Sequence, residues 1–164
     1  MDDREGEKYL FLRVFSMDMD DVKNGIALLE KTKETDARFR IFRDLVVSYG
    51  RPFSTSRGKF IPKHTCPLRV VPKSQMELHL VLIALRNERF AHSDLVEYNP
   101  KLAQWKTKRG WAYPMSFKGT NYGILEKRLP GIKRLVTEVR EQIQQEIQKV
   151  EAKFSELAEK QSGG

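Results

Sequence analysis

Arg86, Asn87 and His92 are the residues whose types and spacing suit chemistry best. They lie in the heptapeptide Arg-Asn-Glu-Arg-Phe-Ala-His, directly after the apolar run 78–85. Histidine can exchange a proton near neutral pH, and the planar guanidinium of arginine can hold two oxygens of a phosphate. Because burying such groups unpaired costs several kcal/mol, the segment is predicted to face a cleft or to pair across an interface.

The spacing leaves the geometry of this segment open. At about 100° per residue, positions 86 and 92 lie about 120° apart on an unbroken α-helix. Either the helix loosens near Ala91, or the side chain of Arg86 swings round, or the two residues meet across a two-fold axis. A simpler interpretation is that both cations only stabilise the carbonyl end of a helix.

Neighbouring ionisable residues are possible supporting groups. Glu88 and Arg89 are better aligned with His92, about 40° and 60° away. Glu88 can orient the imidazole ring, or it can form an ordinary exposed contact four residues apart. His79, seven residues before Arg86, can line the same cleft or be a hydrogen-bonded histidine of the core.

Composition limits the classes of protein to which the chain can belong. The chain of 164 residues, 40% hydrophobic and 32% charged, suits one soluble domain spanning residues 1–164. No apolar stretch approaches the roughly 18 residues of a membrane span. The hydrophilic start is no secretory signal, and a single cysteine, Cys66, fits the cytoplasm. Metal-ligand spacing is not visible, so we expect neither a metal nor another cofactor.

The net charge of +8 is concentrated in two blocks. Residues 37–73 hold nine basic residues against one acidic residue, and residues 95–134 hold nine against two. Together the blocks can form a basin for a polyanion, or simply a solvated basic surface. The candidate RNA-binding residues in them are Arg51, Arg57, Lys59, Lys106, Lys108, Arg109, Trp105 and Trp111.

Apolar periodicity predicts an all-α fold. We expect two helices, or one bent helix, over residues 21–49, beginning near Asp21 with Asp18 or Asp20 as cap. Proline and glycine predict an ordered loop over 50–73. A helix over 74–93 should start with a capping box of Ser74 and Glu77, and a long helix should cover 130–160, with residues 160–164 frayed.

Residues 95–128 are predicted to be irregular or to contain a small hairpin that packs at one end of the bundle. Aromatic residues alternate there, and Gly110 suits a position of positive φ. Trp105, Trp111 and Tyr113 can stack single-stranded bases among the lysines, or they can seal the end of the bundle.

The motif resembles the signature of the HEPN superfamily, in particular its abortive-infection-type prokaryotic branch. In ribonucleases of that family an arginine, usually followed by a polar residue, precedes a histidine by four to six residues. Here the gap is five, Asn87 occupies the polar position, and a Tyr-Gly-Arg-Pro-Phe stretch precedes the motif at residues 49–53. The specific part of the resemblance spans residues 75–94.

The resemblance implies a HEPN-like helical bundle and a metal-independent endoribonuclease in phage defence, toxin action or stress response. Arg86, Asn87 and His92 would then be catalytic, in a cleft formed where the motif helices of a homodimer meet. The partners that the resemblance implies are RNA, a second copy of the chain, and an antitoxin or regulatory protein. Two alternatives remain: a catalytically inactive module that binds RNA or a partner, and a structural protein that dimerises through the 130–160 helix.

Overall fold

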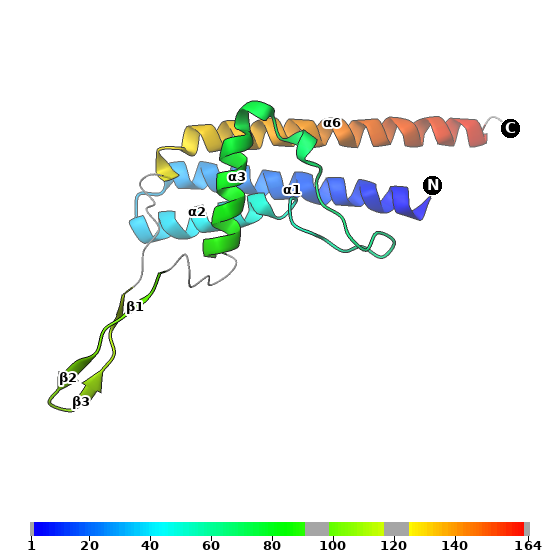
Figure 1. Cartoon of the computed structure of the whole chain (residues 1–164). Helices are drawn as coiled ribbons and strands as arrows, with labels where there is room; N and C mark the ends of the chain where they lie inside the picture. The colour runs from blue at the N-terminus through cyan, green and yellow to red at the C-terminus, as the bar shows by residue number, and fades with distance from the viewer. Residues whose placement is uncertain (1, 91–98, 117–124, 163–164) are drawn as a thin grey trace.

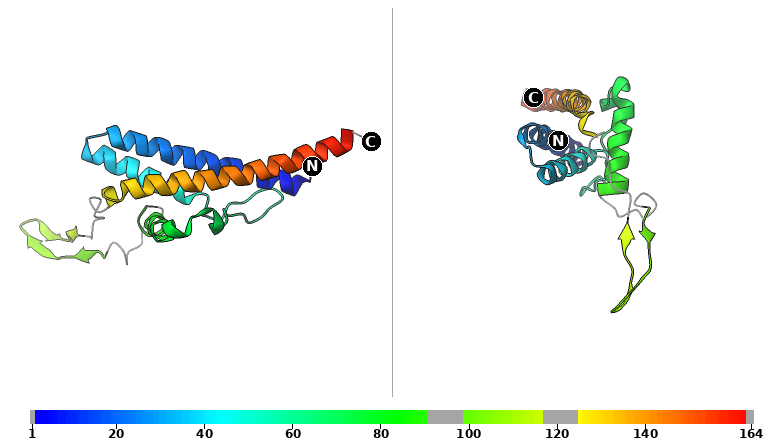
Figure 2. Two further views of the ribbon diagram at one scale, coloured as in Figure 1. Left: turned by 90° about the horizontal axis from the view of Figure 1, so that it is seen from above. Right: turned by 90° about the vertical axis from the view of Figure 1, so that its left-hand side faces the viewer.

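Three long helices lie side by side, and a shorter helix crosses them. The computed structural model describes residues 2–90, 99–116 and 125–162. Helix α1 (Asp3–Lys31) lies between α2 (Thr35–Gly50) and α6 (Leu129–Ser162), and α3 (Met76–Leu85) runs across one face of this layer (Figures 1 and 2). The predicted mainly helical fold with a long C-terminal helix is confirmed.

Helix α1 begins much earlier than the sequence pattern suggested. Its N-cap is Asp2, whose carboxylate accepts a hydrogen bond from the backbone N–H of Arg4. The predicted start near Asp21, capped by Asp18 or Asp20, is therefore wrong. The physical reason is a longer apolar stripe, because buried Phe15 and Met19 continue the stripe of Val22 toward the N-terminus.

The segment 21–49 is divided by a break between α1 and α2. Helix α1 ends at Lys31, and the side chain of Glu34 caps α2 by accepting hydrogen bonds from the backbone N–H groups of Asp36 and Ala37. Arg38 ties the two ends together, since its Nη1 donates to the carbonyl oxygens of Leu29 and Thr32 at 2.7 and 2.6 Å. Two consecutive helices are thus confirmed.

The core lies between α1, α2 and α6 and is almost entirely aliphatic and aromatic. Helix α6 packs lengthwise on α1, as the predicted stripe requires. Its fully buried residues are Ile132, Leu135, Val136, Val139, Ile143 and Ile147. Toward its end the stripe thins out, and Leu157 is 40% exposed. The helix nevertheless continues to Ser162, so fraying from residue 160 is not observed over the described part of the tail.

The loop between α2 and the crossing helix is ordered by a carboxylate from α1. Glu7 accepts hydrogen bonds from the backbone N–H groups of Lys59, Phe60 and Ile61 at 2.5–2.9 Å. A Cβ at Gly58 would collide with the carboxylate of Glu7, so glycine permits this close approach. The loop includes the short helical turn η1 (Leu68–Val70).

Helix α3 begins without the predicted capping box. A 3₁₀ turn, η2 (Lys73–Gln75), leads into it, and its N-cap is Gln75, which makes no side-chain cap hydrogen bond. The proposed role of Ser74 and Glu77 is therefore wrong. Pro72 fixes the backbone just before Lys73, so the chain enters the helix through a tight turn that includes Ser74.

A hairpin arm extends away from the bundle (Figure 1). Strand β1 (Lys101–Leu102) pairs with β4 (Met115–Ser116), and β2 (Trp105–Thr107) pairs with β3 (Gly110–Ala112), both antiparallel. Gly110 has φ +123° at the tip, which confirms the predicted positive-φ glycine. Trp105, Trp111 and Tyr113 are 62%, 57% and 58% exposed, so the interpretation that they seal the end of the bundle is wrong.

Among the described helices, none combines the length and apolar character that crossing a membrane requires.

Candidate functional site

Arg86 stands where the α-helical pattern of α3 ends. The residues Arg86–Phe90 form a π-helical turn, η3, which widens the helix within the arginine–histidine motif. Such turns are uncommon and are often found at functional sites. A loosening near Ala91 was one of the three arrangements that the sequence left open, and the helix loosens at Arg86–Phe90. Residues 91–98, including His92, lie outside the described residues, so the placement of His92 beside Arg86 stays a prediction.

The side chain of Arg86 lies against the backbone of Gly50 at the end of α2. A Cβ at Gly50 would be 3.0 Å from Cγ and 3.2 Å from Cδ of Arg86. Beyond this contact, Nη1 of Arg86 donates a hydrogen bond to Oδ1 of Asn87 at 2.8 Å. The contact with Gly50 thus positions the aliphatic part of the Arg86 side chain, and the hydrogen bond to Asn87 positions one edge of the guanidinium.

The rest of the guanidinium is not neutralised by its own chain within the described residues. Nε of Arg86 is buried and has no hydrogen-bond partner in the part of the chain that the structure describes. None of the carboxylates in residues 2–90, 99–116 and 125–162 forms an ion pair with it. A partly buried arginine with unused donors is suited to receive an anion from outside the chain.

Arg86 lines a cavity of about 320 Å³ between α1, the end of α2 and the loop that follows it. Its lining is mainly apolar and includes three charged side chains. Its lining residues are Phe11, Val14, Phe15, Asp18, Arg51, Ser54, Ser56 and Arg86. Of the residues predicted from the sequence, the structure brings Arg86 and Arg51 together here.

Asp18 is the residue of this cavity that the sequence interpretation missed. Its side chain is 11% exposed and forms an ion pair with Nη1 of Arg51 at 3.4 Å. Burial raises the pKa of the Asp18 carboxyl, and Arg51 counteracts part of that effect. A carboxylate held in a cavity against its desolvation cost is a common feature of functional sites. The sequence signal that could have identified Asp18 is its position, since an acidic residue between the buried Phe15 and Met19 must itself face the interior.

His79 lies in the core and does not line the Arg86 cavity. Its Nδ1 is 2.8 Å from the hydroxyl of Tyr49, and its ring meets Phe53 edge-on at 4.5 Å between centroids. Burial lowers the pKa of His79 and favours the neutral ring. These contacts agree with the alternative of a hydrogen-bonded core histidine.

A second histidine lies closer to the cavity. The ring of His64 stacks on Phe11 and Phe15 at 4.4 and 5.6 Å between centroids, and these phenylalanines line the Arg86 cavity. Its Nε2 is buried without a hydrogen-bond partner among the residues described, and burial lowers the pKa of the ring. His64 therefore supports the apolar wall of the cavity in its neutral form.

The other candidate residues are spread over separate surfaces. Glu88 is exposed on the π turn, and the backbone of Arg89 belongs to the same turn. Arg57 and Lys59 are exposed on the loop tied by Glu7. The remaining candidates lie on the hairpin arm, all of them exposed: Trp105, Lys106, Lys108, Arg109 and Trp111.

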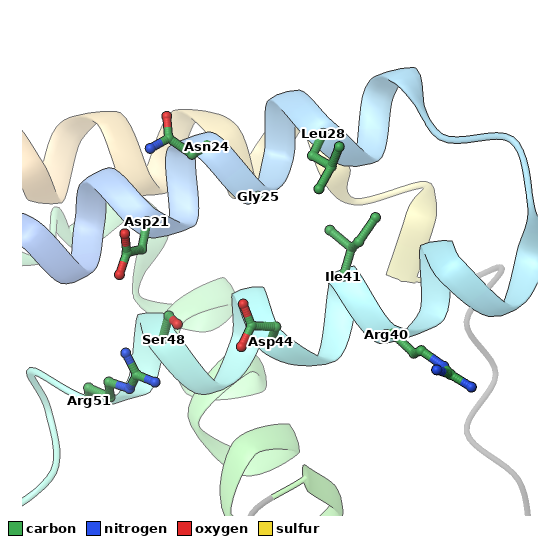
Figure 3. A pocket seen from close by; sticks show the side chains of 9 residues that line it. All are labelled: Asp21, Asn24, Gly25, Leu28, Arg40, Ile41, Asp44, Ser48 and Arg51. Carbon is green, nitrogen blue, oxygen red and sulfur yellow. The ribbon is translucent and has the colours of Figure 1, made fainter.

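A larger groove of about 570 Å³ lies between α1 and α2 and shares Arg51 with the Arg86 cavity (Figure 3). Asp21, Asp44 and Ser48 gather near Arg51 at one end of the groove, and Leu28 faces Ile41 at the other (Figure 3). The groove carries balanced charges and does not include Arg86. It is therefore a less suitable phosphate site than the smaller cavity.

Two other chemistries find little support in the described part of the chain. The described residues contain no group of three or more histidine, cysteine or acidic side chains that could hold a metal ion. Cys66 is buried, and burial raises the pKa of its thiol to about 12, which leaves almost no thiolate at neutral pH.

In the described structure, Arg51 and Arg86 thus line one cavity together with several apolar residues. Arg86 is also the first residue of the motif that ends at His92. Comparisons of the chain with protein-family models, with curated proteins and with solved structures find no match.

Proposed function

We propose that this protein is a metal-independent endoribonuclease of HEPN type that cleaves single-stranded RNA. Arg86 carries the proposal, because it lines a cavity together with Arg51 and has a buried Nε with no hydrogen-bond partner among the described residues. The π turn at Arg86–Phe90 adds support, since it alters the helix within the arginine–histidine motif.

The proposed reaction uses the RNA's own 2′-hydroxyl as nucleophile. The hydroxyl oxygen attacks the adjacent phosphorus, the bond to the leaving 5′-oxygen breaks, and a 2′,3′-cyclic phosphate remains. His92 takes or supplies a proton, and Arg86 stabilises the charge that develops on the phosphoryl oxygens. Asn87 positions Arg86 through the hydrogen bond to its Nη1.

A second copy of the chain would complete the site. In a symmetric dimer each motif residue is supplied twice, so one histidine can act as base and the other as acid. The family resemblance places the motif helices at this two-fold axis, and the same resemblance suggests a role in defence or stress and a regulatory partner.

The competing function is an inactive module that binds RNA without cutting it. The observation that favours it is the hairpin arm, where exposed Trp111 and Tyr113 lie among cations and suit binding without chemistry. Neutralising Lys106, Lys108 and Arg109 together should weaken RNA binding and reduce its salt dependence under either function.

Arg86→Lys tests the proposal. An ammonium cannot reproduce the fork that holds two oxygens, so we expect the single-turnover cleavage rate to fall by about 100-fold or more while the thermal unfolding midpoint stays unchanged. Arg134→Lys, at an exposed position of α6, is the matched control and should cleave like the wild type. If both variants cleave RNA at the same rate, the guanidinium of Arg86 takes no part in the reaction.

A further inference from the structure

The hairpin arm is a single continuous ribbon. Lys101 pairs with Ser116, and Thr107 pairs with Gly110, in one unbroken register. Between the two ladders, the backbone N–H of Ala103 donates to the carbonyl oxygen of Pro114 at 2.9 Å. Pro114 cannot donate in return, which explains why the pairing divides into two short ladders at this point.

The register sorts the side chains of the ribbon into two unequal faces. Successive residues of a strand point to opposite sides, and directly paired residues share a side. One face, here called the Trp111 face, carries Leu102, Gln104, Lys106, Trp111, Tyr113 and Met115. On the opposite face Trp105 is the one large aromatic side chain of the described ribbon. The two tryptophans therefore cannot act on the same ligand surface.

The Trp111 face is apolar and uncovered in the described structure. Leu102, Trp111, Tyr113 and Met115 are 71%, 57%, 58% and 60% exposed. A two-stranded ribbon is only marginally stable on its own in water, and a contiguous exposed apolar face is typical of a binding surface. The arm is thus expected to gain order from a partner.

The charge of the arm decides which partner fits. Residues 99–116 contain Lys101, Lys106, Lys108 and Arg109 and no acidic residue. The arm of a second copy would bring the same cations and be repelled, whereas a polyanion would be attracted. Because Lys106 pairs directly with Trp111, a cation stands beside an aromatic ring on the apolar face.

We infer that the Trp111 face is a stacking platform for the unpaired bases of a single-stranded nucleic acid. Trp111 and Tyr113 stack on bases, while Lys106 and the tip residues Lys108 and Arg109 contact phosphates. A duplex hides its base faces and is a poor ligand for this surface. The inference rests on the proposed function for RNA as the natural ligand, and it adds where the strand binds and why it must be unpaired.

The test measures binding of a short fluorescein-labelled oligodeoxythymidylate to the full-length protein by anisotropy. This probe has no 2′-hydroxyl, so the proposed chemistry cannot consume it. Replacing Trp111 and Tyr113 together by Ala should weaken binding at least about tenfold, because each stacked base contributes measurably to affinity. Trp105→Ala is the matched control on the opposite face and should weaken binding by about twofold or less.

A conservative variant separates stacking from damage to the arm. With Trp111 and Tyr113 both replaced by Phe, the platform is kept and affinity should remain within about threefold of the wild type. An unlabelled duplex of equal length should compete poorly with the labelled strand.

Several results would overturn the inference. The first is a wild type that does not bind the labelled strand. The second is an equal loss of affinity for the double Ala variant and for Trp105→Ala. The third is a double Phe variant that binds as weakly as the double Ala variant. Another is a double Ala variant that binds the strand normally but no longer self-associates in sedimentation, which would make the face a contact between copies. RNA cleavage is scored separately, so strand binding without any cleavage would reject the proposed function and leave this inference standing.

Discussion

Gly50 determines where the side chain of Arg86 can lie. A Cβ at this position would be 3.0 Å from Cγ of Arg86, so Gly50→Ala must displace the arginine. Alanine favours a helix over glycine by about 1 kcal/mol, and the unfolding midpoint should therefore stay the same or rise slightly. RNA cleavage should fall by about 10- to 100-fold, since small displacements of a catalytic group are costly.

Gly25→Ala provides the control for Gly50→Ala. A Cβ at Gly25 would meet Cβ of Leu45 at 3.8 Å, an ordinary contact. Cleavage rates should match the wild type, and the unfolding midpoint should stay the same or rise slightly, as for Gly50→Ala. If both alanine variants lose cleavage equally, the position of Arg86 is not what Gly50 protects.

Asp18 links the cavity to stability through its pKa. Burial raises the pKa of this carboxyl above the ordinary value of 3.8. Between the ordinary and the raised value, the folded protein binds more protons than the unfolded chain, so the free energy of unfolding falls as pH rises through this window. The loss is complete above the raised pKa and absent well below pH 3.8.

Asp18→Asn should consequently be at least as stable as the wild type at pH 7, and its advantage should disappear in acid. Urea unfolding at pH 7 and near pH 3.5 measures this difference. Asp20→Asn, whose carboxylate pairs with Arg140 at a half-exposed site, is the control. A large loss of stability for Asp18→Asn at pH 7 would show that the Asp18–Arg51 ion pair outweighs desolvation.

At the scale of the elements, the contact between α1 and α6 carries much of the stability. Ile143 is fully buried in this contact, and Ile143→Ala should cost about 2–5 kcal/mol of unfolding free energy. Glu141→Ala changes an exposed residue of the same helix and should stay within about 0.5 kcal/mol of the wild type. Denaturant titration of both variants decides whether α6 packs as described.

The success of sequence-based prediction differs from one helix to the next. Helix α6 was predicted nearly to its ends because its apolar stripe is narrow and regular. The start of α1 was missed because exposed Leu10, Val14 and Met17 blur the stripe that Phe15 and Met19 begin. A loosening of the helix near Ala91 was only one of three alternatives, and the π turn at Arg86–Phe90 could not be predicted because no residue type marks it.

Sequence-based prediction of the candidate site succeeded only for residues that lie close together in the chain. Arg86 and Asn87 were found because they adjoin one another in a short motif. Asp18 and Gly50 were not found. Asp18 lines the same cavity as Arg86, and Gly50 contacts the Arg86 side chain, only because α1 and α2 pack near the crossing helix. Local patterns predict residues close in sequence, whereas a cavity assembled from three segments depends on tertiary contacts.

At the scale of the whole molecule, the composite-site proposal requires two copies. We expect sedimentation equilibrium at micromolar concentration to show a dimer, and the Arg86→Lys variant should dimerise equally well because only its chemistry is altered. A monomeric wild type would contradict the shared site and would require a single chain to supply both acid and base.

Cleavage of RNA in EDTA tests the central claim most directly. Purified wild-type protein should convert single-stranded RNA to fragments that end in a 2′,3′-cyclic phosphate, and its deoxy counterpart should remain intact. His92→Ala should fold like the wild type and leave the RNA uncut. If wild-type and His92→Ala proteins instead give the same RNA ladder in EDTA, the endoribonuclease assignment is contradicted.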